Sequence, residues 1–320
     1  MALVWITGAR GFLGRHVAAR FAAGGWDIAG IGLGGAADVD IATLPLVKVS
    51  GKAAWIEKII DNEAIKELLK LVGPPDVVFH AAGSGAIGAS LADPYRDFRL
   101  SVDSTALLLD TLRRSAPEAV FVLPSSAAVY GSAAPGPIAE DASLAPVSPY
   151  GAHKLCAELL CRSASHSFGL KTAVIRYFSL YGPGLQKQLL WDVAGKLSQA
   201  SDEITLFGTG AETRDMLYVE DAAELGFIAA QHATSQCLIV NGGTGVASSV
   251  ESIASELARA LGVDCRIRFN GNSRVGDPNH LQASATRSRS LGFEHRWSLR
   301  DGLAAYAAWW RTGNKGANIK

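Results

Sequence analysis

The sequence has no excess of charge of either sign, because 30 Lys and Arg residues balance 30 Asp and Glu residues among 320. A surface that binds nucleic acid normally shows a basic excess or stripe, so we expect no nucleic-acid partner. No apolar run reaches the roughly 18–20 residues of a membrane span, and the N-terminus lacks the order of a signal peptide. The sequence therefore predicts a cytoplasmic protein with no membrane partner.

Cysteine is also scarce, and the four that occur form no CxxC pair. They are Cys156, Cys161, Cys237 and Cys265. We expect reduced and mostly buried thiols, which fits a reducing cytoplasm and excludes a disulfide framework. The seven His residues are scattered without the spacing of metal ligands, so the sequence predicts no metal site.

Apolar and amphipathic stretches alternate through the first half of the chain. Near-continuous apolar runs are typical of strands buried on both faces, and apolar residues at i, i+3 and i+4 indicate helices. The alternation predicts an α/β fold, a doubly wound parallel sheet with helices on both faces. The expected strands cover residues 3–6, 28–31, 46–49, 76–80, 119–123 and 172–176. The expected helices cover residues 14–23, 54–72, 95–115, 150–168 and 299–311.

A glycine turn follows the first apolar run. Gly8, Gly11 and Gly14 lie between an expected strand and an expected helix, the context in which this spacing binds a dinucleotide. Gly8 permits a tight turn, Gly11 lets the backbone approach a pyrophosphate, and Gly14 lets helix and strand pack closely. Because the helix N-terminus supplies free N–H groups, we expect Phe12 and Leu13 to contact the cofactor as well.

The choice between NAD and NADP depends on residues beside this turn. NAD sites normally carry an acidic residue at the end of the second strand, about 20 residues after the turn. Here that strand runs into Gly32 with no acid before Asp38, and Arg10 is able to pair with a 2′-phosphate. These features tilt the prediction toward NADP, and Asp38 is the residue that could reverse it.

A hydroxyl, a phenol and an ammonium follow in order. Ser126 ends an expected strand, and Tyr150 and Lys154, at i and i+4, share one face of an expected helix. An ammonium and an oxidised nicotinamide favour the phenolate, so we expect Tyr150 to exchange a proton with a carbinol. Lys154 would assist it and hold ribose hydroxyls, and Ser126 would hydrogen-bond the reacting oxygen. This order predicts hydride transfer at a carbon that bears oxygen.

These motifs resemble the extended short-chain dehydrogenase/reductase family, which contains NAD(P)-dependent nucleotide-sugar epimerases, reductases and dehydratases. The resemblance covers almost the whole chain, with further matching stretches at residues 78–82, 176–184, 206–221 and 274–277. It implies a Rossmann-like domain over residues 1–176, joined by part of 216–243, and a nucleotide-sugar lobe over 177–320. It also implies a homodimer that forms through a four-helix interface.

The resemblance also assigns roles to individual residues. The substrate would be a nucleotide-diphosphate sugar, with arginine side chains on its diphosphate. Besides the glycine turn and Arg10, the expected cofactor-binding residues are Gly32, Ala81, Ala82, Tyr150, Lys154 and Tyr177. The expected substrate-binding residues are Ser126, Ser179, Arg214, Arg274 and Asp277.

Departures from the family narrow the expected reaction. The family's 4,6-dehydratases carry Asp and Glu where Ala127 and Ala128 stand, and alanine cannot protonate a leaving hydroxyl. What remains is oxidation or reduction of a sugar carbinol, and we predict a nucleotide-sugar 4-epimerase. The alternative is an NADPH-dependent reductase of nucleotide 4-keto-6-deoxysugars, and a remoter one is a non-catalytic protein that senses NAD(P).

Overall fold

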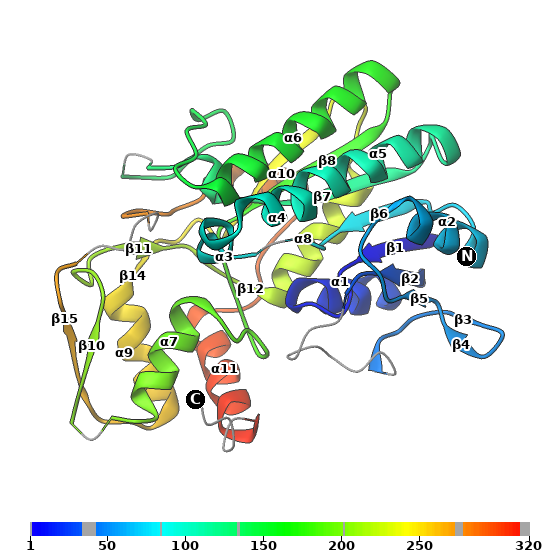
Figure 1. Ribbon diagram of the computed structural model, residues 1–320. Helices are drawn as coiled ribbons and strands as arrows, with labels where there is room; N and C mark the ends of the chain where they lie inside the picture. The colour runs from blue at the N-terminus through cyan, green and yellow to red at the C-terminus, as the bar shows by residue number, and fades with distance from the viewer. Residues whose placement is uncertain are drawn as a thin grey trace.

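A seven-stranded parallel sheet forms the centre of the molecule (Figure 1). The computed structural model describes residues 2–33, 43–83, 85–132, 135–200, 202–272 and 278–313. The sheet strands are β1 (Leu3–Thr7), β2 (Asp27–Ile31), β5 (Trp55–Ile56), β6 (Val77–His80), β7 (Val120–Ser126), β8 (Lys171–Tyr177) and β13 (Leu238–Gly242). Their order is β13-β8-β7-β6-β1-β2-β5, with every neighbouring pair parallel. The predicted α/β fold is confirmed.

Helices cover both faces of this sheet. They are α1 (Phe12–Ala23), α2 (Asn62–Val72), α5 (Ser104–Ser115), α6 (Pro149–Phe168) and α8 (Val219–Gln231). α1 and α8 share one apolar core with Val4 and Phe79 of the sheet. α2, α5 and α6 share a second core with Trp5 and Phe121, on the opposite face. All residues of β1 are buried for this reason, which explains the uninterrupted apolar runs in the sequence.

The structure differs from the sequence-based prediction at one edge of the sheet. The sequence predicts a sheet strand and then a long helix within residues 46–72, but β3 (Lys48–Val49) pairs instead with β4 (Lys52–Ala53) in an antiparallel hairpin. β5 takes the edge position beside β2. Gly30 makes room there for the Trp55 ring, since a Cβ on Gly30 would lie 2.7 Å from that ring. The helix starts later than predicted, where Asp61 caps α2.

The predicted helix over residues 95–115 is interrupted. After α3 (Ile87–Ala92), α4 (Pro94–Phe98) leads into a π-helical turn over Arg99–Asp103, and only then does α5 begin. Turns of this kind are frequent at functional sites. This one brings Ser101 close to the carboxyl end of β6, where a Cβ on Gly83 would lie 3.5 Å from the Ser101 hydroxyl.

A second, smaller layer lies beyond the carboxyl ends of the strands (Figure 1). Its elements are α7 (Gln188–Leu197), β10 (Glu203–Leu206), α9 (Val250–Leu261), β15 (Arg266–Phe269) and α11 (Leu299–Gly313). They share a separate core that includes Val193, Ile253 and Tyr306. The predicted C-terminal helix is confirmed by α11. The short elements near the layer are β9 (Ser179–Tyr181), β11 (Thr213–Arg214), β12 (Met216–Tyr218), β14 (Ser248–Ser249) and α10 (Thr286–Ser290).

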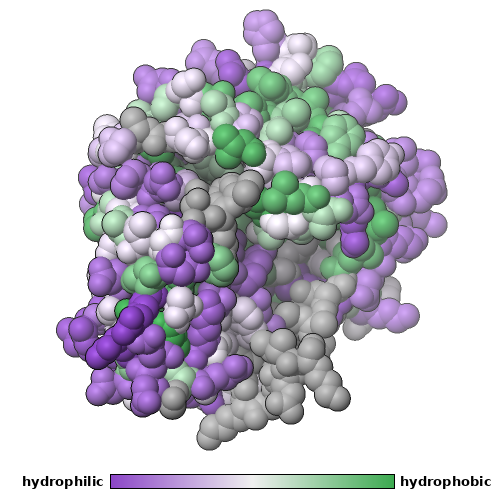
Figure 2. All heavy atoms as spheres, turned by 60° about the vertical axis from the view of Figure 1, so that its left-hand side comes forward, coloured by the Kyte–Doolittle hydropathy of each residue, from purple (hydrophilic) through white to green (hydrophobic). Residues whose placement is uncertain are grey.

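The surface is of mixed polarity. Figure 2 shows a face on which hydrophilic residues predominate and hydrophobic ones are scattered among them. Within the described parts of the chain, no helix combines the length and apolarity that a membrane crossing requires. The same residues contain no group of three or more His, Cys, Asp or Glu side chains placed to hold a metal ion. All four cysteines are free thiols, of which Cys161 and Cys237 are buried.

Candidate functional site

A cleft lies where the strand order reverses, between β1 and β6. Crevices at such switch points, at the carboxyl ends of the strands, are the usual ligand sites of open α/β sheets. The inner compartment has a volume of about 600 Å³, and its lining includes Ser126, Tyr150 and Lys154. An outer compartment of about 380 Å³ adjoins it and is lined by Ser179 and Arg214. The two compartments share wall residues and form one continuous site.

The glycine turn after β1 forms one end of the inner compartment. Gly8 has φ of 67°, a left-handed conformation that glycine adopts without strain, and its carbonyl accepts a hydrogen bond from the Gly11 N–H at 2.9 Å. A Cβ on Gly14 would lie 2.2 Å from the same carbonyl oxygen. α1 starts directly after Gly11 with no side-chain cap, so its first N–H groups face the cleft. This cradle fits a dinucleotide pyrophosphate.

Replacing Gly14 with alanine is expected to destabilise the protein by about 1–3 kcal/mol, because the new methyl group has no room beside the Gly8 carbonyl. Displacement of the turn should also weaken NAD binding by about tenfold or more. Calorimetric titration of NAD into protein stripped of bound nucleotide and thermal unfolding measure the two effects. The matched control is Gly195→Ala in α7, where a Cβ meets nothing within 4 Å. Unchanged NAD affinity in Gly14→Ala would show that the cofactor binds elsewhere.

A buried histidine holds the strand ends beneath the turn. His80 Nδ1 lies 2.8 Å from Thr7 Oγ1, and His80 Nε2 lies 3.0 Å from Ser104 Oγ. Thr7 Oγ1 also accepts a hydrogen bond from the Ala82 N–H at 3.0 Å. Burial, assisted by the charge of Lys154, lowers the pKa of His80 to about 3, so the ring is neutral at physiological pH. The network fixes Ala82 relative to β1.

The Arg10 side chain pairs with a carboxylate of the protein. Its Nη1 forms an ion pair with Glu57 Oε1 at 3.1 Å, just after β5. A 2′-phosphate at this position would compete with that carboxylate. Gly32 is buried beside the turn, where a Cβ would lie 3.2 Å from the Gly8 nitrogen. Asp38 lies outside the described residues. Arg10 thus has a partner in the protein, and the predicted tilt toward NADP stays a prediction.

Ser126, Tyr150 and Lys154 meet in the inner compartment. Ser126 is the last residue of β7, and its Oγ accepts a hydrogen bond from the Ala128 N–H at 3.2 Å. Lys154 Nζ donates to the Pro124 carbonyl at 2.8 Å and lies 5.9 Å from the centre of the Tyr150 ring. The spacing of four residues on α6 thus turns both side chains toward the end of β7.

Burial dominates the electrostatics of this group. It lowers the pKa of Lys154 to about 8, against the opposing charges of Asp97 and Glu158. It raises the pKa of Tyr150 above its ordinary value, although a hydrogen bond with Ser126 acts in the other direction. Burial thus outweighs the hydrogen bond with Ser126 at Tyr150, and the predicted shift toward the phenolate depends on the cofactor as well as on Lys154. The positive charge of an oxidised nicotinamide would be needed beside Lys154 to favour the phenolate.

Local interactions position Tyr150 at the start of α6. Ser148 caps the helix by accepting a hydrogen bond from the Gly151 N–H at 3.2 Å, and Pro149 occupies the first turn, where no N–H is needed. The Tyr150 N–H donates to the buried Ser90 hydroxyl at 3.0 Å. A Cβ on Gly151 would lie 2.6 Å from the Ala128 carbonyl, so this glycine allows α6 to approach the end of β7.

Of the remaining predicted cofactor residues, some face the inner compartment directly and one is engaged mainly in the core. Gly11, Phe12, Leu13 and Ala81 line the inner compartment directly. Tyr177 also contributes to its wall, but the Tyr177 hydroxyl donates to the Ala222 carbonyl at 2.7 Å in the core. Its phenol is therefore engaged in packing β8 against α8 and is not directed at a ligand.

Two of the five predicted substrate residues lie in the outer compartment. Ser179 and Arg214 both line the outer compartment. Arg214 Nη1 donates to the carbonyls of Thr213 and Pro278 at 2.9 and 2.8 Å, which holds the guanidinium at the wall. Arg274 and Asp277 lie outside the described residues, so their predicted contacts with a diphosphate stay predictions.

Two features of the cleft were not found from the sequence. Lys187, just before α7, lines the inner compartment and donates from Nζ to the Gly85 carbonyl at 3.0 Å. Asp97 of α4 is 2% exposed, and its Oδ2 lies 2.5 Å from Nδ1 of His153, the neighbour of Lys154. Neither belongs to a local motif, because each contact joins segments that are distant in the chain.

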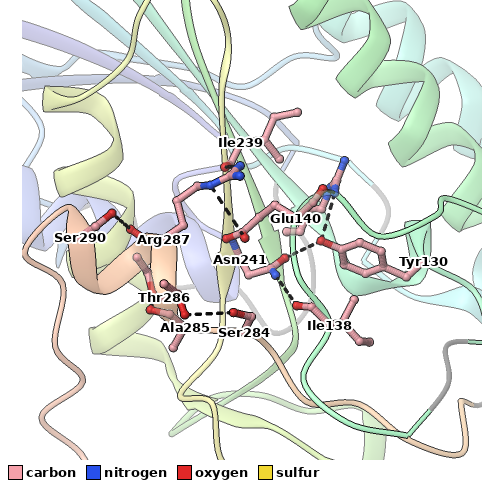
Figure 3. A network of polar contacts seen from close by, with 12 residues as sticks. Tyr130, Ile138, Glu140, Ile239, Asn241, Ser284, Ala285, Thr286, Arg287 and Ser290 are labelled. Carbon is pink, nitrogen blue, oxygen red and sulfur yellow. Dashed lines mark hydrogen bonds and ion pairs between the residues drawn. The ribbon is translucent and has the colours of Figure 1, made fainter.

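A polar network links the segment after β7 to the edge strand β13. Figure 3 shows Tyr130, Glu140 and Asn241 pointing toward one another, with Arg287 beside them. Tyr130 donates to Asn241 Oδ1 at 2.7 Å, and the Asn241 N–H donates to Glu140 Oε1 at 2.9 Å. Arg287 Nη1 donates to the Ile239 carbonyl at 2.7 Å. These bonds join the segment after β7 to β13 and α10.

Comparison with known proteins agrees with this geometry. The model of a family described as "NAD dependent epimerase/dehydratase family" matches residues 4–241. A UDP-glucose 4-epimerase of Azospirillum brasilense is 29% identical, over 96% of this chain and 91% of its own. A dTDP-glucose 4,6-dehydratase of Streptomyces griseus is also 29% identical, over 95% and 93%. A UDP-glucuronic acid 4-epimerase from Bacillus cereus, in complex with UDP-glucuronic acid and NAD, is 26% identical, with a TM-score of 0.84 over 97% of this chain and 99% of that one.

Proposed function

The chain belongs to the NAD dependent epimerase/dehydratase family, as its motifs predicted, and from this premise we propose that it interconverts nucleotide sugars at C4. The observation that carries the proposal is the inner compartment, where Ser126, Tyr150 and Lys154 converge beside the glycine turn. Ordered hydroxyl, phenol and ammonium groups next to a dinucleotide cradle suit reversible oxidation of a carbinol.

Each of the three side chains has a separate task in this proposal. NAD, when bound, supplies a hydride acceptor and donor at the sugar carbon. Tyr150 takes the proton of the C4 hydroxyl as the carbinol is oxidised, and returns a proton when the ketone is reduced on its other face. Ser126 holds the reacting oxygen by a hydrogen bond, and the Lys154 ammonium stabilises the phenolate charge. Inversion at C4 requires the 4-keto sugar to rotate within the cleft, so that its opposite face is presented for reduction.

The lining of the inner compartment favours epimerisation over dehydration. Ala127 and Ala128 follow Ser126, and no described residue that lines the compartment is an aspartate or a glutamate. Elimination of water from a 4-keto sugar needs an acid to protonate the leaving hydroxyl. The dehydratase relative is 29% identical to this chain, but the described lining offers no carboxyl group for that step.

We propose NAD as the cofactor rather than NADP. The solved relative from Bacillus cereus is a complex with NAD. In this chain the Arg10–Glu57 ion pair leaves the guanidinium partly neutralised where a 2′-phosphate would need it. An epimerase also keeps its cofactor through the reaction, so we expect NAD to stay bound during purification.

The domain boundaries, the oligomeric state and the cellular location also belong to the proposal. We propose a cofactor domain over residues 1–176, joined by part of 216–243, and a substrate lobe over 177–320, because β13 completes the sheet while α7, α9 and α11 have their own core. We also propose a homodimer in the cytoplasm. α5 and α6 lie side by side (Figure 1), and Leu159 and Phe168 of α6 are 51% and 56% exposed, as a shared four-helix interface requires.

The proposed function is tested by analysing the bound nucleotide and the reaction together. The protein is denatured and the released nucleotide identified, and fresh protein is then incubated with UDP-, GDP- and dTDP-sugars with and without added NADPH. We expect NAD in near-stoichiometric amount and interconversion of 4-epimers without added cofactor. Chromatography of the sugar products measures the conversion.

Other outcomes would assign the chain differently. Consumption of NADPH with a nucleotide 4-keto-6-deoxysugar, without any epimerisation, would identify the alternative reductase. Nucleotide binding without turnover of any sugar would indicate the non-catalytic NAD(P)-sensing protein. Release of water and formation of a 4-keto-6-deoxy product would contradict the reasoning from Ala127 and Ala128.

A further inference from the structure

We propose that Lys187 selects a nucleotide sugar whose sugar ring carries a carboxylate, by forming an ion pair with that group in the inner compartment. This inference rests on the proposed function and goes beyond it, because it names the chemical class of the sugar. It is carried by the position of Lys187, by the charges that surround it, and by the separation of the two compartments.

Lys187 is held inside the cleft although it comes from the second layer. It occupies the N-cap position of α7, and its Nζ reaches across to the Gly85 carbonyl at 3.0 Å. The next residue, Gln188, also directs its Nε2 to the same carbonyl, at 3.5 Å, and has φ of 65°. A non-glycine residue in this left-handed conformation is strained, and such strain persists where the surroundings impose it. The turn is therefore fixed with its lysine on the cleft wall.

The ammonium of Lys187 is accessible to a ligand and partly desolvated by the cleft walls. The residue is exposed at the cleft surface, yet the surrounding walls desolvate the amine and lower its pKa below its ordinary value. No carboxylate contributes to that shift. A carboxylate brought in by a ligand would form an ion pair there in a partly desolvated setting, where such pairs are stronger than on an open surface.

The described side chains that line the inner compartment carry positive charges only, although the carboxylates of Asp97 and Glu158 act on Lys154 from outside the lining. Among the described residues that line it, the only charged side chains are Lys154 and Lys187. Their repulsion is felt at Lys154, whose pKa the charge of Lys187 helps to lower. The outer compartment differs, because Asp192, Glu212 and Arg214 line it with both signs. An anionic group on the ligand is thus most favoured next to the catalytic residues.

The separation of the compartments distinguishes a sugar carboxylate from the diphosphate. Arg214 lines only the outer compartment, whereas Ser126, Tyr150 and Lys187 line only the inner one. In the proposed function the sugar ring must lie against Ser126 and Tyr150. The cofactor pyrophosphate, the other anion of this compartment, is assigned to the glycine turn at Gly11 and Phe12 and not to α7. We therefore assign an anion at Lys187 to the sugar, and a carboxylate is the anionic substituent of uronic acid sugars.

The test compares UDP-glucuronate with UDP-glucose as substrates of the full-length protein. The wild type should prefer UDP-glucuronate, and Lys187→Met should lower the ratio of the two kcat/KM values on the order of 10- to 100-fold. Lys187→Arg keeps the positive charge and should retain most of the preference. Lys66→Met, on the exposed surface of α2, is the matched control for loss of a lysine and should leave the ratio unchanged.

Three results would overturn the inference. They are a wild-type preference for UDP-glucose, an unchanged ratio in Lys187→Met, and an equal loss for both substrates, the last of which would place Lys187 on the diphosphate. Calorimetric Kd values for the same two ligands separate this inference from the proposed function. A Lys187-dependent preference in Kd without any turnover would refute the function and support the inference. Epimerisation of UDP-glucose with no Lys187-dependent preference would do the reverse.

Discussion

Replacing Tyr150 with phenylalanine is expected to lower the rate of 4-epimerisation by roughly 10²- to 10⁴-fold, the usual contribution of a positioned acid–base group. The ring stays in place, because the backbone N–H of residue 150 keeps its bond to Ser90 and Lys154 keeps its bond to the Pro124 carbonyl. What is lost is the hydroxyl that exchanges a proton with the sugar and bonds with Ser126. NAD affinity and Tm should therefore change little while turnover falls.

Turnover is measured with each nucleotide sugar that the wild type accepts, alongside thermal unfolding and titration with NAD. The matched control is Tyr95→Phe, since Tyr95 is 72% exposed and removal of its hydroxyl should leave the rate unaltered. Full activity in Tyr150→Phe would remove Tyr150 from the chemistry. Loss of activity together with loss of NAD binding would instead indicate damage to the cleft.

Much of the fold could be predicted because the sheet is covered on both faces. Strands such as β1 are buried at every position and apolar over most of their length, and that leaves a clear signal in the sequence. The prediction was wrong at the edge, where β5 is only two residues long and depends on Gly30 for space against the Trp55 ring. Because β5 depends on one packing contact with the neighbouring strand, its sequence shows no periodic hydrophobic pattern that would predict it.

In the candidate site, too, some residues could be predicted from the sequence and others could not. Tyr150 and Lys154 were predicted together because their contact is local to one helix, with a spacing that the helix itself converts into proximity. Lys187 was not predicted, because its role arises from a bond to Gly85, which is distant in the chain. The partner of Arg10 was missed for the same reason, since Glu57 reaches it only through the position of β5.

Replacing Glu158 with glutamine is expected to destabilise the protein by about 3–5 kcal/mol, the usual effect of removing one partner from a buried ion pair. Glu158 and Arg176 are 1% and 2% exposed, and Arg176 Nη2 donates to Glu158 Oε2 at 2.8 Å. Glu158 also accepts a hydrogen bond from Ser125, the neighbour of Ser126 in β7. Glutamine would leave the guanidinium charge buried without compensation.

The effect should appear as a fall in Tm on the order of 10 °C. Glu63→Gln is the matched control, because its ion pair with Lys66 is solvent-exposed and should contribute no measurable change. The double variant Glu158→Leu with Arg176→Met should lose less stability than the sum of its single variants, since neither buried charge then remains. Additive losses would mean that the two charges act independently. In that case the hydrogen bonds of Arg176 to Tyr130 and to the Glu140 carbonyl, at 3.0 and 2.8 Å, would hold β8 in place without Glu158.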